Sequence, residues 1–217
     1  MANGNDRLVW IDCEMTGLDV ARDELVEVAV VVTDFELELL DPGFDVLIRP
    51  SQAALDGMSD FVREMHTKSG LLAELAGGVD LATAQQQVLD YIRRFVPAKG
   101  QAPLAGNTIG TDRMFLAGQM PEVDAHLHYR NIDVSTIKEL SRRWFPRVYF
   151  NAPEKRGGHR ATADIKESIR ELRYYRAAAF QPQPGLGSEE LREASRRIAE
   201  DFAPHLHPAQ APAPGLG

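Results

Sequence analysis

Two acidic residues, Asp12 and Glu14, stand inside an otherwise apolar run, WIDCEMTGLD at residues 10–19. The run predicts a buried β-strand, and residues two positions apart on a strand point to the same face. Asp12 and Glu14 therefore share one face, while Ile11, Cys13 and Met15 occupy the other and pack into the core. The alternative is an edge strand whose polar face meets water.

Two more acids stand at the beginnings of predicted helices. Asp112 follows a short strand in GNTIGTDRMFL, and Asp164 opens the last helix in GGHRATADIKESI. His159 precedes Asp164 by five residues, which on a helix turn through about 500°, so the two would not share a face if both were helical. We therefore expect His159 in the glycine-containing approach loop, where it could serve as a general base beside the acids.

The four carboxylates predict a metal site if their segments meet in the fold. Carboxylates that converge on one point cannot all stay ionised without cations. Oxygen ligands favour Mg²⁺ or Mn²⁺, and two such ions about 3.5 to 4 Å apart could hold the attacking and leaving oxygens of a phosphoryl centre. The chemistry that these residues predict is hydrolysis of a phosphodiester.

The elements that must position the acids indicate an α/β fold. The strand at 7–15, a valine-rich run at 24–34 and GFDVLIRP at 43–50 predict an antiparallel meander. Two short helices are expected within 59–75 and longer helices at 81–96 and 160–179, and strand-then-helix units begin near 103 and 128. We expect a mixed β-sheet flanked by α-helices, with Trp10 and Trp144 in its core.

Composition indicates one globular domain with an appendage. The chain has 217 residues, of which 44% are hydrophobic, enough for one full-sized core. The motifs lie in residues 1–180. Residues 181–217 are rich in Pro and Gly, and we expect a mostly disordered tail with one short helix.

Charge and hydropathy narrow the expected partners. The net charge of −8 argues against a long nucleic-acid duplex or a membrane surface, because both are normally met by a basic patch. The N-terminus shows no signal peptide and no apolar stretch approaches about 20 residues, so we expect a cytoplasmic protein. The single cysteine, Cys13, agrees with a reducing compartment.

The acidic motifs resemble those of a known enzyme family. D-x-E at 12–14, the aspartate of GNTIGTD and H-x4-D at 159–164 are similar to the three motifs of the DEDDh 3′→5′ exonucleases, whose fold is ribonuclease H-like. The segments LVWIDCEMTGLD, PLAGNTIGTDRMFL, HYRNIDVSTIKEL and HRATADIKESIRELRYYR resemble the oligoribonucleases within that family. The resemblance covers residues 7–180. It implies a homodimeric 3′→5′ exoribonuclease that degrades short oligoribonucleotides, especially dinucleotides, to mononucleotides with two Mg²⁺ or Mn²⁺ ions per site.

The resemblance also implies a role for each acid. One metal ion would be held by Asp12, Glu14 and Asp164. Asp12 would bridge to the second ion with the help of Asp112, and His159 would deprotonate the attacking water.

Seven further residues are implied to bind the substrate: Leu18, Phe61, His66, Thr108, Tyr129, Arg130 and Ser135. The first two would hold the bases, since an aromatic ring stacks on any base, and His66 would lie near the pocket. Thr108, Arg130 and Ser135 would cap the 5′ phosphate, and Tyr129 would reach across from the partner subunit.

Three positions depart from the family pattern. Ala163 stands where relatives often have Asp, which should cost little because Asp164 is the matching acid. Phe61 stands where Trp is frequent and Thr108 where Ser is common, and both changes concern the fit of the pocket.

Three other functions compete with this assignment. A DNA-proofreading exonuclease of the same motif class usually has TTG after its D-x-E, whereas this chain has MTG. A binding module that has lost catalysis would not need all four acids and the histidine. A glycosidase needs two carboxylates and leaves Asp112 and Asp164 unexplained.

Overall fold

The computed structural model describes residues 6–154 and 160–206. The chain divides into two compact units, Met1–Ala179 and Phe180–Gly217. In the second unit, α10 (Ser188–Leu206) is a helix of 19 residues. In the described part of the chain, no helix is both long enough and apolar enough to cross a membrane.

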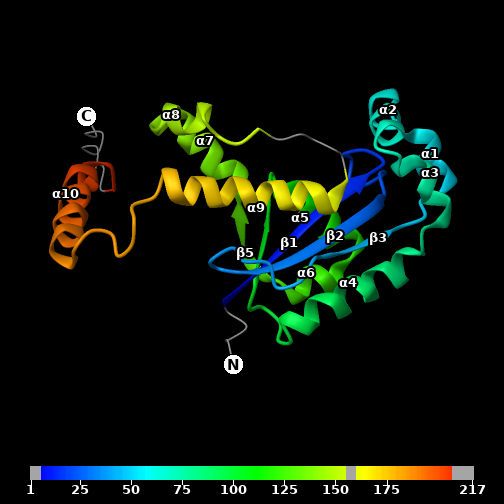
Figure 1. Cartoon of the computed structure of the whole chain (residues 1–217), viewed down its shortest axis with the longest axis horizontal. Helices are drawn as coiled ribbons and strands as arrows, with labels where there is room; N and C mark the ends of the chain where they lie inside the picture. The colour runs from blue at the N-terminus through cyan, green and yellow to red at the C-terminus, as the bar shows by residue number, and fades with distance from the viewer. Residues whose placement is uncertain (1–5, 155–159, 207–217) are drawn as a thin grey trace, which may run out of the picture. The chain divides into compact units, whose positions relative to one another are not determined.

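A five-stranded sheet forms the centre of the first unit, with the spatial order β3-β2-β1-β4-β5 (Figure 1). The strands are β1 (Arg7–Met15), β2 (Leu25–Asp34), β3 (Phe44–Leu47), β4 (Pro103–Gly106) and β5 (His128–Asp133). The first three form the predicted antiparallel meander, and β4 and β5 are added in parallel. The prediction of a mixed sheet is confirmed. Since β1 is its central strand, the acids of β1 do not lie on an edge.

The strand sequences show why β1 and β2 occupy the middle of the sheet. Every residue of β2 is buried except Asp34, as expected for a valine-rich strand that is covered on both faces. On β1 the indole Nε1 of Trp10 donates a hydrogen bond of 2.9 Å to Thr33 Oγ1 on β2. This bond satisfies the one polar atom of a large buried side chain.

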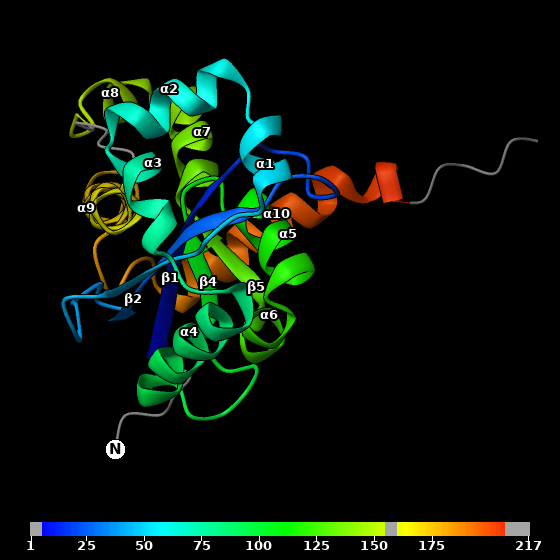
Figure 2. The same ribbon diagram turned by 90° about the vertical axis from the view of Figure 1, so that its right-hand side faces the viewer.

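Helices cover both faces of the sheet. One face packs against α4 (Leu81–Phe95), α5 (Gly110–Gln119) and α6 (Pro121–His126), and the other packs against α7 (Val134–Trp144) and α9 (Ala161–Ala178). Figure 2 shows α9 on one side of the sheet and α4, α5 and α6 on the other.

The alternation of β1 between the two faces fixes the direction of its acids. Val9, Ile11 and Cys13 join the cluster beneath α4, whereas Leu8 and Trp10 join the cluster beneath α9. Side chains two apart share a face, so the acids at positions 12 and 14 open on the α9 side. The prediction of one core face and one acidic face is confirmed.

The remaining elements are short. They are α1 (Gln52–Gly57), α2 (Asp60–Lys68), α3 (Leu71–Glu74), a 3₁₀ turn at Leu75–Gly77 and α8 (Pro146–Phe150). The sequence prediction contained α2 and α3 but missed α1, α6 and α8. Their signals were present, because Ser51 caps α1 and a proline opens each of α6 and α8.

The predicted core position of Trp144 is wrong. Trp144 is the last residue of α7 and its surface is 66% exposed. The helix packs into the α9-side cluster through Val134 and Ile137, and Trp144 lies beyond these contacts.

Candidate active site

Three of the predicted metal ligands converge on the α9 side of β1. Asp12, Glu14 and Asp164 offer carboxylate oxygens that all lie within 4.8 Å of one another. The first two come from the end of β1, and Asp164 comes from the first turn of α9. The assumption that these distant segments meet is therefore correct.

Asp112 joins the same site from α5. Its side chain is buried in the first turn of that helix, and its Oδ1 accepts a hydrogen bond of 2.9 Å from the backbone N–H of Cys13. Cys13 lies between Asp12 and Glu14 on β1, so this bond fixes the fourth acid beside the other three. The thiol of Cys13 itself faces the core.

Burial and repulsion between neighbouring carboxylates raise the pKa values of Asp12, Glu14 and Asp112. Burial, followed by the charges of Asp112 and Glu14, raises the pKa of Asp12 to about 9. Burial, followed by Glu27 and Asp164, raises the pKa of Glu14 to about 8. Burial raises the pKa of Asp112 to about 6, although the hydrogen bond from the Cys13 backbone opposes the increase. A divalent cation would stabilise the ionised form of such a cluster, and the all-oxygen donor set suits Mg²⁺ or Mn²⁺.

Two cavities meet at this cluster. One, of about 510 Å³, contains the acids Asp12, Glu14, Asp112 and Asp164. The other, of about 890 Å³, extends from Glu14 along the 16–24 loop, α1 and α2. Cys13, Glu14, Met15 and Leu18 line both. A ligand whose reacting group lies at the acids could therefore extend into the larger cavity.

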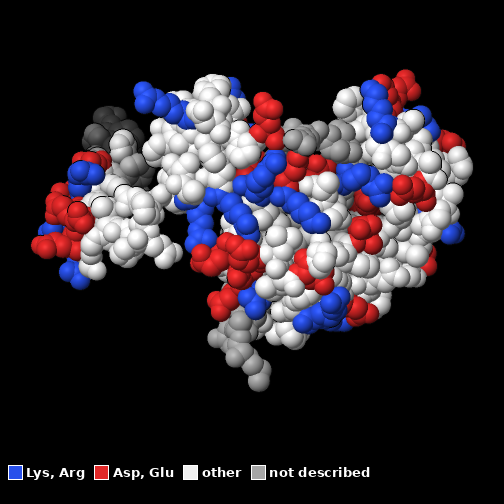
Figure 3. All heavy atoms as spheres, in the orientation of Figure 1, with Lys and Arg blue, Asp and Glu red and all other residues white. Residues whose placement is uncertain are grey.

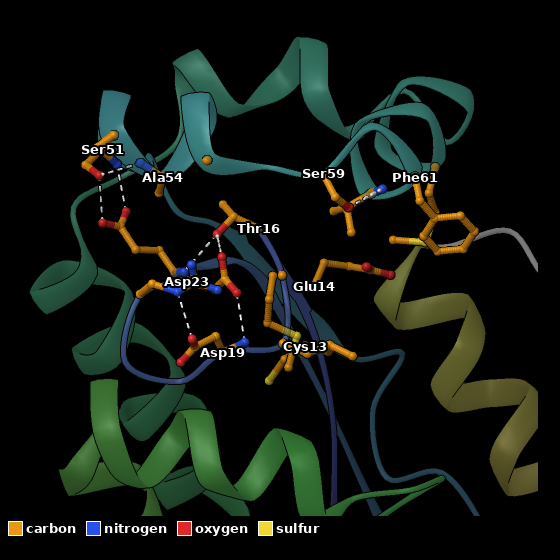
Figure 4. Close-up of a pocket in the computed structure, with 18 residues that line it drawn as sticks. Cys13, Glu14, Thr16, Asp19, Asp23, Ser51, Ala54, Ser59 and Phe61 are labelled. Carbon is orange, nitrogen blue, oxygen red and sulfur yellow. Dashed lines mark hydrogen bonds and ion pairs between the residues drawn. The ribbon is translucent and has the colours of Figure 1, made fainter.

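The predicted base-binding residues line the larger cavity. Leu18 and Phe61 are both highly exposed for apolar side chains, at 75% and 77%. In Figure 4, Glu14 and Phe61 lie on the same side of this cavity. Exposed apolar side chains beside a polar site are available to contact a ligand.

His66 lies behind the site and lines neither cavity. Its side chain is fully buried, with Nε2 at 2.8 Å from the carbonyl oxygen of Met15 and Nδ1 at 3.9 Å from Glu14 Oε2. His66 was expected near the pocket, and the structure places it behind Glu14 and Met15, where it supports the end of β1 from α2.

A hydrogen-bonded loop that the sequence analysis missed presents Leu18. Thr16 Oγ1 and the N–H of Asp19 both donate to the Asp23 carboxylate, at 3.2 and 2.8 Å (Figure 4). A Cβ on Gly17 would lie 2.3 Å from Asp23 Oδ2, so a larger residue here would displace the Asp23 carboxylate from its hydrogen bonds. The loop is therefore held in one shape around Asp23.

The residues predicted to cap a phosphate are only partly brought together. Thr108 lines the smaller cavity and has a positive φ of 60°. Its N–H, and both the N–H and the Oγ of Ser135, donate to the same oxygen of Asp133, at 3.0, 2.9 and 2.7 Å. Asp133, which the sequence analysis did not single out, therefore holds Thr108 and Ser135 together through hydrogen bonds.

Tyr129 and Arg130 line neither cavity. Tyr129 is 74% exposed on β5, and the guanidinium carbon of Arg130 lies 5.4 Å from the centre of its ring. These two side chains stand together on the outermost strand of the sheet.

His159 lies outside the described residues, and the described chain resumes at Arg160. Arg160 contacts a fifth acid, Glu27 of β2, which sequence reasoning missed. Glu27 is buried and pairs directly with Glu14 in the β1–β2 register. Burial raises its pKa, and the charge of Arg160 opposes the increase.

Comparison with protein families gives one match of direct relevance. The family described as exonuclease (RNase T) matches residues 9–172. The chain is 66% identical over 206 residues to an oligoribonuclease of Leifsonia xyli subsp. xyli, covering 95% of this chain and 100% of that protein. It is 60% identical over 200 residues to an oligoribonuclease of Streptomyces griseus (92% and 100% covered) and 54% identical over 213 residues to one of Mycobacterium tuberculosis (98% and 99%).

Solved structures of similar fold include exonuclease I. The metal-free E. coli exonuclease I–single-stranded DNA complex matches with a TM-score of 0.61 at 14% identity, covering 91% of this chain and 44% of that one. Exonuclease I of Methylocaldum szegediense matches with a TM-score of 0.56 at 18% identity, covering 90% and 45%. The chain thus spans less than half of these enzymes. The likeness confirms the predicted ribonuclease H-like fold.

The raised pKa values predict how stability depends on pH. In EDTA, the folded protein holds protons on Asp12 and Glu14 that the unfolded chain releases above about pH 4. Its stability should therefore fall as pH rises from 5 through the folded pKa values of about 8 and about 9. Excess Mg²⁺ should offset the fall, because it stabilises the ionised acids.

Thermal unfolding between pH 5 and 9, with EDTA or Mg²⁺, measures this effect. Asp12→Asn should flatten the pH dependence in EDTA, whereas Asp56→Asn, at an exposed position on α1, should keep it. A wild-type midpoint in EDTA that does not fall with pH would contradict the electrostatic account.

Proposed function

This chain belongs to the exonuclease family that matches its residues 9–172, and within it to the oligoribonucleases, with which it shares 54–66% identity over nearly its whole length. On this premise we propose that it degrades short oligoribonucleotides from their 3′ ends. The observation that carries the proposal is the convergence of Asp12, Glu14 and Asp164 within 4.8 Å. Buried acids are costly to the fold. A cluster of them at the meeting point of two cavities is therefore best explained by function.

The acids form a centre for two divalent cations, Mg²⁺ or Mn²⁺. Asp12, Glu14 and Asp164 would hold one ion, and Asp12 and Asp112 the other. Bound cations would supply charge neutralisation for the acids and for the phosphodiester during its hydrolysis. The backbone N–H of Cys13 keeps Asp112 oriented toward this centre.

His159 is the general base of the proposed reaction. It would accept a proton from the water that attacks the 3′-terminal phosphodiester. The bond from phosphorus to the 3′ oxygen of the preceding nucleotide then breaks, and a 5′-mononucleotide is released. Its place in the sequence, one residue before Arg160 and five before Asp164, supports this role.

The cavities suit a substrate of about two nucleotides. Leu18 and Phe61 would hold the bases in the larger cavity, and Thr108 and Ser135, joined by Asp133, would receive the 5′ phosphate together with Arg130. A dinucleotide carries few phosphates and releases few counterions on binding. A protein with a net charge of −8 can therefore bind it without a basic groove.

The working form is a homodimer in the cytoplasm, with catalysis confined to residues 1–180. The exposed Tyr129 on the outermost strand, β5, supports a reach toward a partner subunit, because the free edge of a sheet is a pairing surface. The free thiol of Cys13 agrees with a reducing compartment. Residues 181–217 have no role in the proposed reaction.

Turnover of labelled nucleic acids tests the proposed function. A 5′-labelled RNA dinucleotide should be converted rapidly to mononucleotides with Mn²⁺ and not with EDTA, while 20-mers of RNA and DNA should be cut far more slowly. Faster cutting of the 20-mers would contradict the proposed substrate.

Asp12→Ala should abolish turnover of the RNA dinucleotide, since it removes the acid proposed to bridge both ions.

The role of Phe61 can be tested with a matched exposed aromatic. Loss of a stacking side chain costs about 1 to 3 kcal/mol per base, so Phe61→Ala should raise KM for the dinucleotide by roughly 5- to 150-fold. Phe35, 46% exposed between β2 and β3, lines neither cavity, and Phe35→Ala should leave KM unchanged. Equal KM values for the two variants would remove Phe61 from the base-binding site.

A further inference from the structure

The N-terminus of α9 is capped by a side chain from the β-sheet, that of Glu27 on β2. Arg160 is the N-cap residue of this helix, and its side chain accepts no capping hydrogen bond. Instead, the N–H of Ala161 donates to Glu27 Oε2 on β2, at 3.4 Å. A carboxylate at this position satisfies a helix N–H group and interacts favourably with the positive end of the helix dipole.

Arg160 links the same carboxylate to a third element. Its Nη2 lies 3.4 Å from Glu27 Oε1, and its Nη1 donates a hydrogen bond of 3.0 Å to Glu74 Oε1 on α3. Glu27 is buried, whereas Glu74 is partly exposed. The guanidinium therefore bridges β2 and α3 at the point where α9 begins, and its planar donors suit two carboxylates at once.

This bridge is one helical turn away from a metal ligand. The N–H of Asp164 donates to the carbonyl oxygen of Arg160, at 3.1 Å, and the N–H of Ala163 donates to the same oxygen at 2.9 Å. A displacement of Arg160 would thus move the first turn of α9 and with it Asp164. The displacement allowed is small, because the oxygens of Asp164, Asp12 and Glu14 must all stay within 4.8 Å of one another.

The positive charge of Arg160 also reduces the repulsion between two acids that face each other on β1 and β2. Glu14 and Glu27 face each other in the β1–β2 register, and side chains of such a pair lie on the same face. Like charges in this arrangement repel each other. Among the described residues, Arg160 is the cation that forms an ion pair with Glu27. Replacing Arg160 would therefore leave a buried acid without its ion pair next to a metal ligand.

We propose that Arg160 is a positioning residue for the metal site: by joining Glu27 and Glu74, it fixes the first turn of α9 so that Asp164 can bind metal together with Asp12 and Glu14. This inference rests on the proposed metal site. Arg160 acts through Asp164, and it lines neither cavity.

A matched control exists at the other end of the same helix. Figure 3 shows Lys and Arg side chains gathered along α9, with acidic side chains beside them. Among these pairs, Arg176 Nη2 lies 2.6 Å from Glu36 Oε2. Arg176→Gln therefore removes one ion pair between α9 and the rest of the domain, and Arg160→Gln removes two, those with Glu27 and Glu74. Only the Arg160 change lies one helical turn from Asp164.

The experiment measures Mn²⁺ binding without substrate by calorimetry, and kcat and KM with an RNA dinucleotide. Loss of a residue that orients a metal ligand typically costs about 10- to 100-fold in metal affinity. Arg160→Gln should weaken Mn²⁺ binding and lower kcat by this amount, with KM changed less than about twofold because Arg160 does not line the cavity that holds Leu18 and Phe61. Arg160→Lys, which keeps the charge, should regain part of both losses. Arg176→Gln should bind Mn²⁺ and turn over substrate like the wild type.

Three results would overturn the proposal: wild-type Mn²⁺ affinity in Arg160→Gln, equal weakening in Arg176→Gln, or no recovery in Arg160→Lys. If Arg160→Gln does not fold, Glu74→Gln provides the test, because it removes only the outer half of the bridge. It should weaken Mn²⁺ binding several-fold, and unchanged binding would overturn the proposal. Because the binding measurement uses no substrate, a wild-type protein that binds Mn²⁺ but leaves the dinucleotide intact would count against the proposed function alone.

Discussion

The repulsion among buried carboxylates at the end of β1 is the constraint that the surrounding structure must satisfy. Asp12, Glu14, Asp112 and Asp164 come from three different elements, and Glu27 adds a fifth acid beside them. Without a cation, Asp12 and Glu14 favour their protonated forms at neutral pH, as their pKa values of about 9 and about 8 indicate. The fold offsets part of the cost through the Cys13 N–H and the Arg160 guanidinium. Bound divalent cations would offset more of it.

The sheet makes this concentration of charge possible. As the central strand, β1 has hydrogen-bonded neighbours on both sides, and its alternate side chains Val9, Ile11 and Cys13 are anchored beneath α4. The opposite face is free to present acids where α9 begins. The same strand end continues into the Asp23-centred loop that presents Leu18. The acids of β1 and Leu18 of the larger cavity therefore lie on one continuous segment of chain, to which α5 and α9 add Asp112 and Asp164.

The sequence was sufficient to predict the features that depend on local pattern. Alternation on β1 placed Asp12 and Glu14 on one face, and local pattern placed Asp112 and Asp164 at helix starts. That these helix starts meet the end of β1 was an assumption, which the structure supports. One residue that it missed, Glu27, acts across a long separation. Glu27 contacts Ala161, 134 positions away, and no local period signals such a contact. The assignment of Trp144 to the core was wrong, because the local sequence does not show where a helix extends past the end of its packing partners.

The most direct test of the account is the number of Mn²⁺ ions that the protein binds, measured by equilibrium dialysis of the wild type and of Asp12→Asn at neutral pH. The account predicts two ions per chain for the wild type and the loss of at least one in the variant, because Asp12 is the ligand common to both sites. A folded wild type that binds no Mn²⁺, or a variant that binds as much as the wild type, would contradict the assignment of these carboxylates to a metal centre.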